Sequence, residues 1–360
     1  MVHPNFTANM SAKFVNNCLK FSLVAVFLLF QQLSFSQSSF PLLDKTVEEK
    51  KKALGNDFTV MVTGADTITY QKTAGDLPPK TPVPIGALSQ WLTTAVVLQL
   101  ADEGKLSLDD KISKYLPVFE SYRKGYITIR HCLSHQTGIG TEGFKLAALF
   151  EKEKFNTLEE AVPNIAKKEI HANAGEQFRY SNYGIVIAAR IVEIVSKKRF
   201  DQFIRAKLFV PLAMRNTSFT TDDGSAPNPA MGAKSTAMDY SRFLQMLLKG
   251  GKVGEKQILT ASAIEELRKV QVRQDQISIV PKVAEGFGFA LGSWMTEGNK
   301  TVGEKATALA LPGLTGTWAM LDFARNYAFV VISKNIAGEQ KSEAYVDLKK
   351  AIDQQVPVKK

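Results

Sequence analysis

Three side chains with reactive groups lie close together in the segment I-T-I-R-H-C-L-S-H-Q-T-G, residues 127–138. His131 and His135 are four residues apart, so on a helix they could share one face and bind a metal ion. A zinc hydrolase also needs a third ligand and a general base, and the sequence has no H-E-x-x-H motif. We therefore predict that both histidines anchor a helix and a loop by hydrogen bonds, with no metal bound. Cys132 between them is predicted to be a small, buried, apolar side chain.

Ser89 and Tyr180 are two further candidates for nucleophilic or acid–base chemistry. A serine hydroxyl becomes a nucleophile beside a base that takes its proton. The residue three positions after Ser89 is Leu92, so helix capping or a hydrogen bond to a substrate is the preferred interpretation of Ser89. The phenol of Tyr180 has an ordinary pKa of about 10 unless a cation lies beside it, which makes it a poor base on its own.

A predicted helix after Pro84 has to position Ser89. Apolar residues return there at three- and four-residue intervals, which is the spacing of one helix face: Leu88, Trp91, Leu92, Ala95, Val96 and Leu98. Gly104 beyond them fits a left-handed C-cap. The pattern predicts a buried turn that opens an amphipathic helix.

Residues 84–100 resemble the nucleophile helix of the serine β-lactamase and penicillin-binding-protein family, which reads I-G-S-x-S-K at this place. A serine and a lysine three residues apart at a helix start share one face, so the amine can accept the hydroxyl proton. In this chain those two positions are Ala87 and Gln90. Ala87 has no hydroxyl, and the Gln90 amide cannot act as a base near neutral pH.

Other stretches resemble the class C-like branch of the same family. Residues 104–117 match G-K-L-x-L-D-D…Y-L-P, residues 127–138 match I-T-I-R-H-L-L-x-H-T-S-G, and Y-S-N at 180–182 matches the second catalytic motif. In that branch the tyrosine relays a proton, and the asparagine contacts the substrate or the lysine. The resemblance assigns these places to Tyr180 and Asn182. Without the lysine, packing and hydrogen bonding around a vestigial cleft is the preferred interpretation of both.

The third family motif reads H-T-G-F-T-G-T and precedes a strand that begins at an aspartate. Residues 311–317, L-P-G-L-T-G-T, lie at the matching distance before Asp322. Leu311 replaces the histidine or lysine of this motif. By correspondence, the backbone N–H groups of Ala87 and Leu314 would form the oxyanion hole, and Gly313 is counted with the binding residues. The resemblance therefore implies a pocket that could hold a carbonyl group without attacking it.

The resemblance covers residues 42–354 and implies an α/β (α+β) fold of the β-lactamase/transpeptidase type. Its antiparallel sheet comes from the N- and C-terminal segments and is flanked by helices. A mainly helical region is inserted at about residues 87–276, and the site lies in the cleft between the two parts. Local patterns predict the following elements: helices over 42–54, 141–170, 185–195, 240–248 and 346–354, and strands over 57–63, 67–71, 286–292 and 327–333. Ser235 or Thr236 is the predicted N-cap of the helix at 240–248.

The first 36 residues have the pattern of a secretory signal. An apolar run over 21–30 follows basic residues, and Ser34 and Ser36 fit a small-residue cleavage site. Translation would start at Met1 or Met10, and residues 37–360 would form one secreted or periplasmic domain. An uncleaved anchor is the disfavoured alternative, because a spanning helix needs about 20 apolar residues. We predict no membrane span in the mature chain.

The chain carries a formal net charge of +10, with 45% hydrophobic and 22% charged residues, which is ordinary for a globular protein. Its lysines are spread along the sequence without interleaved aromatic residues, which argues against nucleic-acid binding. A solvated basic surface is the expected consequence, and weak attraction to an anionic cell envelope is the alternative. Cys132 alone would remain after signal cleavage, so no intramolecular disulfide is expected.

From these observations we predict a secreted, catalytically inactive homologue of the hydrolase family. It would use no cofactor and would bind a peptide-like or acyl ligand, a cell-wall fragment, or a protein partner. Two alternatives stay open. One is an active serine hydrolase of esterase, peptidase or β-lactamase type with Ser89 as nucleophile, and the other is a structural envelope module with no ligand in the cleft.

Overall fold

The computed structural model describes residues 40–140, 155–221, 223–313, 316–334 and 342–358. The chain from Phe40 onward forms one compact unit. The predicted secretory signal and Leu314 lie outside the described residues. Within them, no helix combines the length and the apolar composition that crossing a membrane requires.

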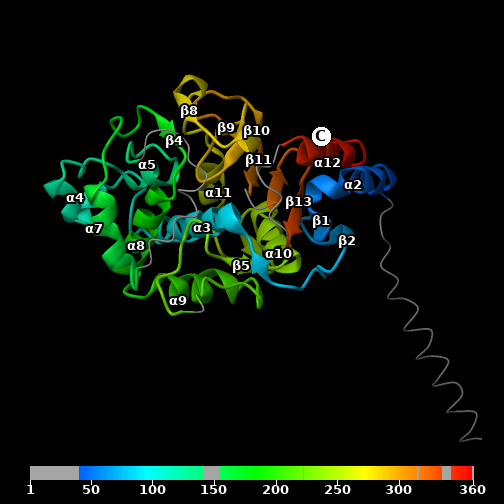
Figure 1. Ribbon diagram of the computed structural model, residues 1–360, viewed down its shortest axis with the longest axis horizontal. Helices are drawn as coiled ribbons and strands as arrows, with labels where there is room; N and C mark the ends of the chain where they lie inside the picture. The colour runs from blue at the N-terminus through cyan, green and yellow to red at the C-terminus, as the bar shows by residue number, and fades with distance from the viewer. Residues whose placement is uncertain (1–39, 141–154, 222, 314–315, 335–341, 359–360) are drawn as a thin grey trace, which may run out of the picture. The chain divides into compact units, whose positions relative to one another are not determined.

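A seven-stranded antiparallel sheet forms one part of this unit, with the strand order β2-β1-β13-β12-β11-β10-β9 (Figure 1). The predicted hairpin is present as β1 (Phe58–Gly64) and β2 (Ile68–Ala74). β1 pairs with the last strand, Phe58 opposite Ser333, so an N-terminal and a C-terminal segment lie side by side in the sheet. The predicted sheet of N- and C-terminal segments is thus confirmed. Its other strands are β9 (Gly288–Phe289), β10 (Trp294–Gly298), β11 (Ala306–Pro312), β12 (Trp318–Asp322) and β13 (Tyr327–Ser333).

Helices cover both faces of this sheet. Neighbouring residues of a strand point to opposite faces, and residues paired across two strands point to the same face. Met61 pairs with Val330 and contacts Ser241 of α10 (Ala237–Leu248). Trp318 pairs with Val331 and stacks on Tyr345 of α12 (Glu343–Asp353), with ring centroids 4.5 Å apart. α10 and α12 therefore lie on opposite faces, which explains why all of β13 is buried. α2 (Pro41–Leu54) packs beside α12 (Figure 1).

The helix predicted after Pro84 begins as a 3-10 turn, Gly86–Leu88, and continues as α3, Ser89–Asp102. Gly104 has φ +66°, as predicted for a C-terminal cap. The amphipathic assignment is wrong, because every residue from Ser89 to Leu100 is buried. α3 is enclosed by helices and is in contact with α8 (Tyr183–Ser196), α9 (Phe200–Ile204) and α11 (Ala261–Arg268). Two of its polar side chains donate to backbone carbonyls: Thr93 to Pro229 at 2.7 Å, and Gln99 to Ile258 at 3.0 Å.

A mainly helical region surrounds α3, as the resemblance implied. Two-residue strands β3 (Val83–Pro84) and β5 (Lys234–Ser235) pair at its border with the sheet. Its remaining elements are α4 (Val118–Ser121), α5 (Ile129–Leu133), α7 (Leu158–Lys167), α8 (Tyr183–Ser196), α9 (Phe200–Ile204), a π-helical turn (Arg205–Phe209), α11 (Ala261–Arg268), the strands β4 (Phe178–Arg179), β6 (Lys252–Val253), β7 (Lys256–Gln257) and β8 (Ile277–Ile279), and 3-10 turns at Ile112–Lys114, Gln274–Gln276 and Lys282–Ala284.

Most local predictions agree with these elements. Thr236 is the N-cap of α10, since its hydroxyl accepts the Asp239 N–H at 3.0 Å. Of the predicted helix over 141–170, residues 158–167 are helical and 141–154 lie outside the described residues. Within 286–292, the strand is limited to Gly288–Phe289. The strand start assigned to Asp322 is wrong: Asp322 ends β12, and its carboxylate pairs with Arg325 and Lys349.

Candidate active site

The turn that carries Ala87 is held by hydrogen bonds from both parts of the molecule. Gly86 has φ +52°, a conformation that favours glycine. The N–H of Ile85 donates to the carbonyl of Ala233 at 3.0 Å, and the carbonyl of Ile85 accepts the hydroxyl of Thr317 at 3.1 Å. The phenol of Tyr240 donates to the Leu88 carbonyl at 3.0 Å. These bonds fix the first residues of α3, and the Ala87 methyl group is fully buried there.

Gln90 takes part in a buried chain of side-chain hydrogen bonds. Its amide Nε2 donates to the hydroxyl of Tyr180 at 2.8 Å, and its Oε1 lies 3.1 Å from Nε2 of His135. Gln90 and Tyr180, which the sequence placed in two separate motifs, are therefore in direct contact. All three side chains are nearly or fully buried. The third member, His135, was predicted only as a loop anchor.

The hydrogen bonds define the protonation of His135. The N–H of Ser181 points at its Nδ1, 3.5 Å away, so Nδ1 acts as the acceptor. Nε2 then carries the proton and donates it to the Oε1 of Gln90, which turns the amide nitrogen toward Tyr180. Burial lowers the pKa of His135 to about 3 and raises the pKa of the Tyr180 phenol. The hydrogen-bonded side chains of Gln90, Tyr180 and His135 are therefore all neutral at physiological pH.

Aromatic rings form the walls around His135. Its ring centroid lies 4.6 Å from that of Tyr180, 5.6 Å from that of Phe178 and 5.2 Å from that of Phe289. Trp294 packs in turn against Phe178, with centroids 5.2 Å apart. These apolar walls remove water from the site, and a charged group there would lose its hydration.

The two histidines do not share a helix face. α5 ends at Leu133, and His135 lies beyond it with φ +54°. His131 belongs to the capping box of α5, where its Nδ1 accepts the Thr128 N–H at 3.2 Å. Among the described residues, no group of three or more His, Cys, Asp or Glu side chains could hold a metal ion. Cys132 is fully buried, and its burial raises the pKa of the thiol.

The Ser89 hydroxyl is engaged with the backbone. It donates to the Gly86 carbonyl at 2.6 Å and accepts the Ala233 N–H at 3.1 Å. The side chain is fully buried. Ser89 thus ties the turn before α3 to the residue that precedes β5, and both of these hydrogen-bond partners are backbone groups. The hydroxyl does not cap α3, because it accepts no N–H group of that helix. The two backbone bonds fit a structural role for Ser89 better than a nucleophilic one.

The third motif lies beside the turn that carries Ala87. Leu311 is fully buried in β11, opposite Ala319. The N–H of Gly313 donates to the Thr317 carbonyl at 2.7 Å, which closes the loop of this motif. An added Cβ at Gly313 would lie 2.0 Å from the Thr317 hydroxyl oxygen, so glycine is required by space. Asn182 precedes α8 and lines a cavity of about 110 Å³ with Tyr183 and other residues.

The arrangement brings together Ala87, Gln90 and Tyr180 and adds His135, which sequence reasoning assigned no part in the site. A polar side chain on the buried side of a helix needs a hydrogen-bonding partner. That rule could have pointed from Gln90 to a further polar residue, although it could not say which one. Chemically, the site can donate and accept hydrogen bonds. It presents no nucleophile at residue 87 and no titrating base at residue 90.

Comparison with known proteins gives one family. The family model "Beta-lactamase" matches residues 43–351. Protein flp of Staphylococcus aureus is 31% identical over 157 residues, which are 43% of this chain and 31% of that protein. Beta-lactamase-like protein 2 of Dictyostelium discoideum is 27% identical over 206 residues, 52% of this chain and 37% of that protein. The chain thus spans about a third of the length of these curated relatives.

Solved structures share the fold. A protein from Bacteroides dorei that is assigned to the beta-lactamases superimposes with a TM-score of 0.77 at 25% identity, covering 88% of this chain and 98% of its own. The D-alanine carboxypeptidase AmpC of Burkholderia cenocepacia superimposes with a TM-score of 0.68 at 17% identity, covering 88% and 98%.

Proposed function

This chain belongs to the beta-lactamase family, and from that premise we propose that it is a secreted, non-hydrolysing member. It binds a peptide-like or acyl ligand, a cell-wall fragment or a protein partner without forming a covalent intermediate. The observation that carries the proposal is the pair of hydrogen bonds made by the Gln90 amide. Where the family motif has a lysine, a neutral amide is hydrogen-bonded to Tyr180 and His135.

Two chemical losses support the absence of turnover. Attack on a carbonyl needs an activated nucleophile, and residue 87 offers a methyl group. Removing a catalytic nucleophile typically lowers kcat by a factor on the order of 10⁶. Proton transfer needs a group that titrates near the working pH, whereas burial holds the pKa of His135 far below that range and that of Tyr180 above it.

What remains supports recognition of a carbonyl group. The backbone N–H of residue 87 is unchanged by the loss of the serine side chain, and the phenol and amide groups of Tyr180 and Asn182 are retained. Without a nucleophile no tetrahedral oxyanion forms, so these donors can contribute only to binding of the ground-state carbonyl group.

The test is incubation of the purified protein with labelled penicillin and with a chromogenic ester, followed by intact-protein mass spectrometry. We expect no adduct and no ester turnover above the buffer rate. Stoichiometric labelling would refute the proposal, and ester turnover abolished by Ser89→Ala would replace it with the active-hydrolase alternative.

Binding is tested separately by calorimetric titration with an N-acyl dipeptide. We expect weak, reversible binding that Tyr180→Phe reduces, while Tyr122→Phe, which changes an exposed tyrosine, leaves it unaltered. If Tyr180→Phe and Tyr122→Phe bind the dipeptide equally well, the ligand does not contact Tyr180, and the binding site for it or for a protein partner lies elsewhere.

A further inference from the structure

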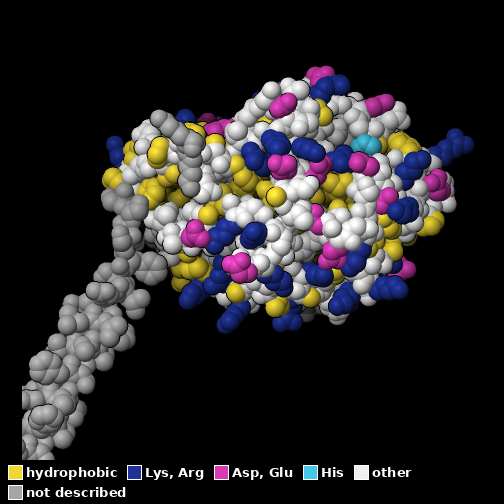
Figure 2. Space-filling model, turned by 180° about the vertical axis from the view of Figure 1, so that it is seen from behind, with side chains coloured by type: hydrophobic (Ala, Val, Ile, Leu, Met, Phe, Trp, Pro, Cys, Tyr) yellow, Lys and Arg dark blue, Asp and Glu magenta, His cyan; other side chains and the backbone are white. Residues whose placement is uncertain are grey.

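A run of basic residues surrounds α9, on the helical side of the molecule. Between residues 197 and 215 the sequence holds six basic residues and one acidic residue, Asp201. We call the basic ones the α9 basic edge: Lys197, Lys198, Arg199, Arg205, Lys207 and Arg215. Lys207 is partly buried, and the other five are exposed. Figure 2 shows Lys and Arg side chains along the lower edge of the molecule, where α9 lies in Figure 1.

Two cavities flank α9, and each is lined by members of this edge. The first, of about 410 Å³, is lined by Lys197, Lys198 and Arg199 where α8 meets α9. The second, of about 600 Å³, is lined by Arg205 and Arg215, with hydroxyls of Ser218 and Thr220 beside them. Arg205 comes from the π-helical turn, a rare geometry that is frequent at functional sites.

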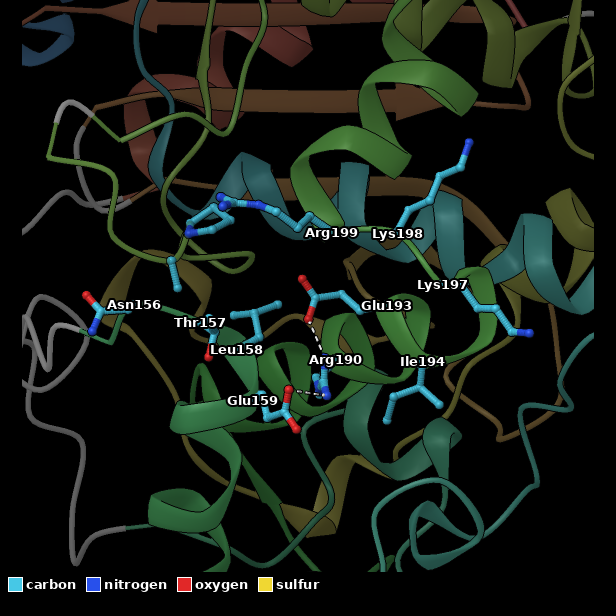
Figure 3. A pocket seen from close by; sticks show the side chains of 12 residues that line it. Asn156, Thr157, Leu158, Glu159, Arg190, Glu193, Ile194, Lys197, Lys198 and Arg199 are labelled. Atoms are coloured by element: carbon cyan, nitrogen blue, oxygen red, sulfur yellow. Dashed lines mark hydrogen bonds and ion pairs between the residues drawn. The ribbon is translucent and has the colours of Figure 1, made fainter.

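The carboxylates near these cavities are already engaged. Figure 3 shows Arg190 between Glu159 and Glu193, with both ion pairs at 3.0 Å, while Lys197 and Lys198 extend outward. Asp201 accepts from Arg199 at 3.1 Å, and Glu103 pairs with Lys207 at 2.7 Å.

Four cations of the edge have no such partner. Within the part of the chain that the structure describes, the side chains of Lys197, Lys198, Arg205 and Arg215 make no ion pair and no hydrogen bond. Exposed charges of one sign repel one another, and a bound polyanion neutralises them while it releases the cations condensed on its own chain. The edge therefore favours an anionic ligand with several charges.

We propose that the α9 basic edge binds a linear, phosphate-bearing polymer, which lies along α9 and places anionic groups in both cavities. From Phe200 to Phe209 the chain is helical, a length of about 15 Å at 1.5 Å per residue, so a single phosphate cannot reach both ends. Arginine forks suit phosphate oxygens. A flexible single chain can follow concave cavities that a rigid nucleic-acid duplex cannot enter. This inference does not depend on the proposed function.

The test is calorimetric titration of the full-length protein with long-chain inorganic polyphosphate at several salt concentrations. We compare K197A/K198A and R205A/R215A with K51A/K52A, which removes two adjacent exposed lysines from α2. All three variants lose the same charge. The slope of log affinity against log salt is negative, and each edge variant should make it shallower by about two. K51A/K52A should have the wild-type slope. Thermal melting checks that the variants are folded.

Three results would overturn the proposal. The first is an equal loss of affinity in K51A/K52A, which would mean attraction by net charge alone. The second is full competition by orthophosphate at the same phosphate concentration, which would mean a site for one anion. The third is tighter binding of duplex DNA with the same dependence on the edge variants.

Discussion

At the scale of single residues, Gln90 decides the chemistry of this site. A lysine at residue 90 would bring a positive charge into a space walled by Phe178, Phe289 and the ring of Tyr180. The amide instead donates from its nitrogen to Tyr180 and accepts at its oxygen from His135, and it carries no charge. The pair Tyr180 and His135 is thereby satisfied without any charge, which is the least costly way to bury polar groups.

Restoring the family pair tests this interpretation. The double substitution Ala87→Ser with Gln90→Lys should recover acylation by labelled penicillin only in part, because Leu311 still replaces a polar group. The lysine must also lose its hydration, so the variant should melt at a lower temperature than the wild type. Intact-protein mass spectrometry and thermal melting measure the two effects. Full family-level activity would show that our view of Leu311 is wrong.

Truncating Gln90 should be costly for folding. Gln90→Ala leaves the buried groups of Tyr180 and His135 with one partner fewer and opens a cavity, so the free energy of unfolding should fall by about 2–4 kcal/mol. Urea denaturation measures the change. Gln202→Ala, at an exposed position of α9, is the control, and its free energy of unfolding should lie within about 0.5 kcal/mol of the wild type. A similarly small effect for Gln90→Ala would mean that the chain of hydrogen bonds contributes little.

At the scale of elements, N-caps and ion pairs set where helices begin and how they attach to the sheet. α10 covers one sheet face from its cap at Thr236, and α12 covers the other. Lys349 of α12 lies 3.3 Å from Asp322 at the end of β12, and within 2.6 Å of Asp353. The ammonium group therefore neutralises a fully buried carboxylate while it docks the helix.

The α10 cap can be tested by a single substitution. Thr236→Ala removes the oxygen that accepts the Asp239 N–H, which should cost about 1 kcal/mol in the free energy of unfolding. Thr236→Ser retains the oxygen and should restore most of it. Chemical denaturation of the three proteins gives the comparison. Equal losses in both variants would assign the effect to the lost methyl group instead of the cap.

Removing the α12 cation should have a larger effect. Lys349→Met leaves Asp322 buried without its ammonium partner, although Arg325 remains beside it, and breaking a buried pair costs about 3–5 kcal/mol. Lys350→Met, one residue away on an exposed position, is the matched control and should change stability by less than about 1 kcal/mol. Both values come from urea denaturation. Similar losses of stability in the two variants would show that the buried ion pair of Lys349 and Asp322 contributes no more than an exposed pair.

At the scale of the whole molecule, a neutral buried histidine makes stability depend on pH. The pKa of His135 is about 3 in the folded protein, against about 6.5 in an unfolded chain. Below pH 6.5 the unfolded state binds a proton that the folded state does not, so the free energy of unfolding falls as pH falls. The slope from this residue is about 1.4 kcal/mol per pH unit until pH approaches 3.

The expected consequence is a loss of about 2 kcal/mol from His135 between pH 7 and pH 5. Urea denaturation of the wild type at these two pH values, compared with His135→Asn, isolates the contribution, because the variant lacks the titrating group. His131, whose pKa burial also lowers, is present in both proteins. The prediction fails if His135→Asn and the wild type lose the same free energy.

Much of the molecule follows from local patterns. The hairpin of β1 and β2, the bounds of β13 and the cap of α10 depend on residues within a few positions of one another, so turn, strand and capping signals suffice. The prediction that Ala87 and Gln90 stand where the family motif has its serine and lysine also rests on motif spacing alone. The order of the motifs likewise indicated the family and its sheet.

Tertiary structure alone decided what surrounds these positions. The partners of Gln90 lie 90 and 45 residues away in the sequence, at Tyr180 and His135, and no periodicity links such distant segments. The same holds for α3, whose polar residues resemble a solvent-facing stripe until helices from later segments enclose it. Local sequence sets backbone conformation through short-range interactions. The choice of partner for a buried polar group depends on which distant segments pack around it.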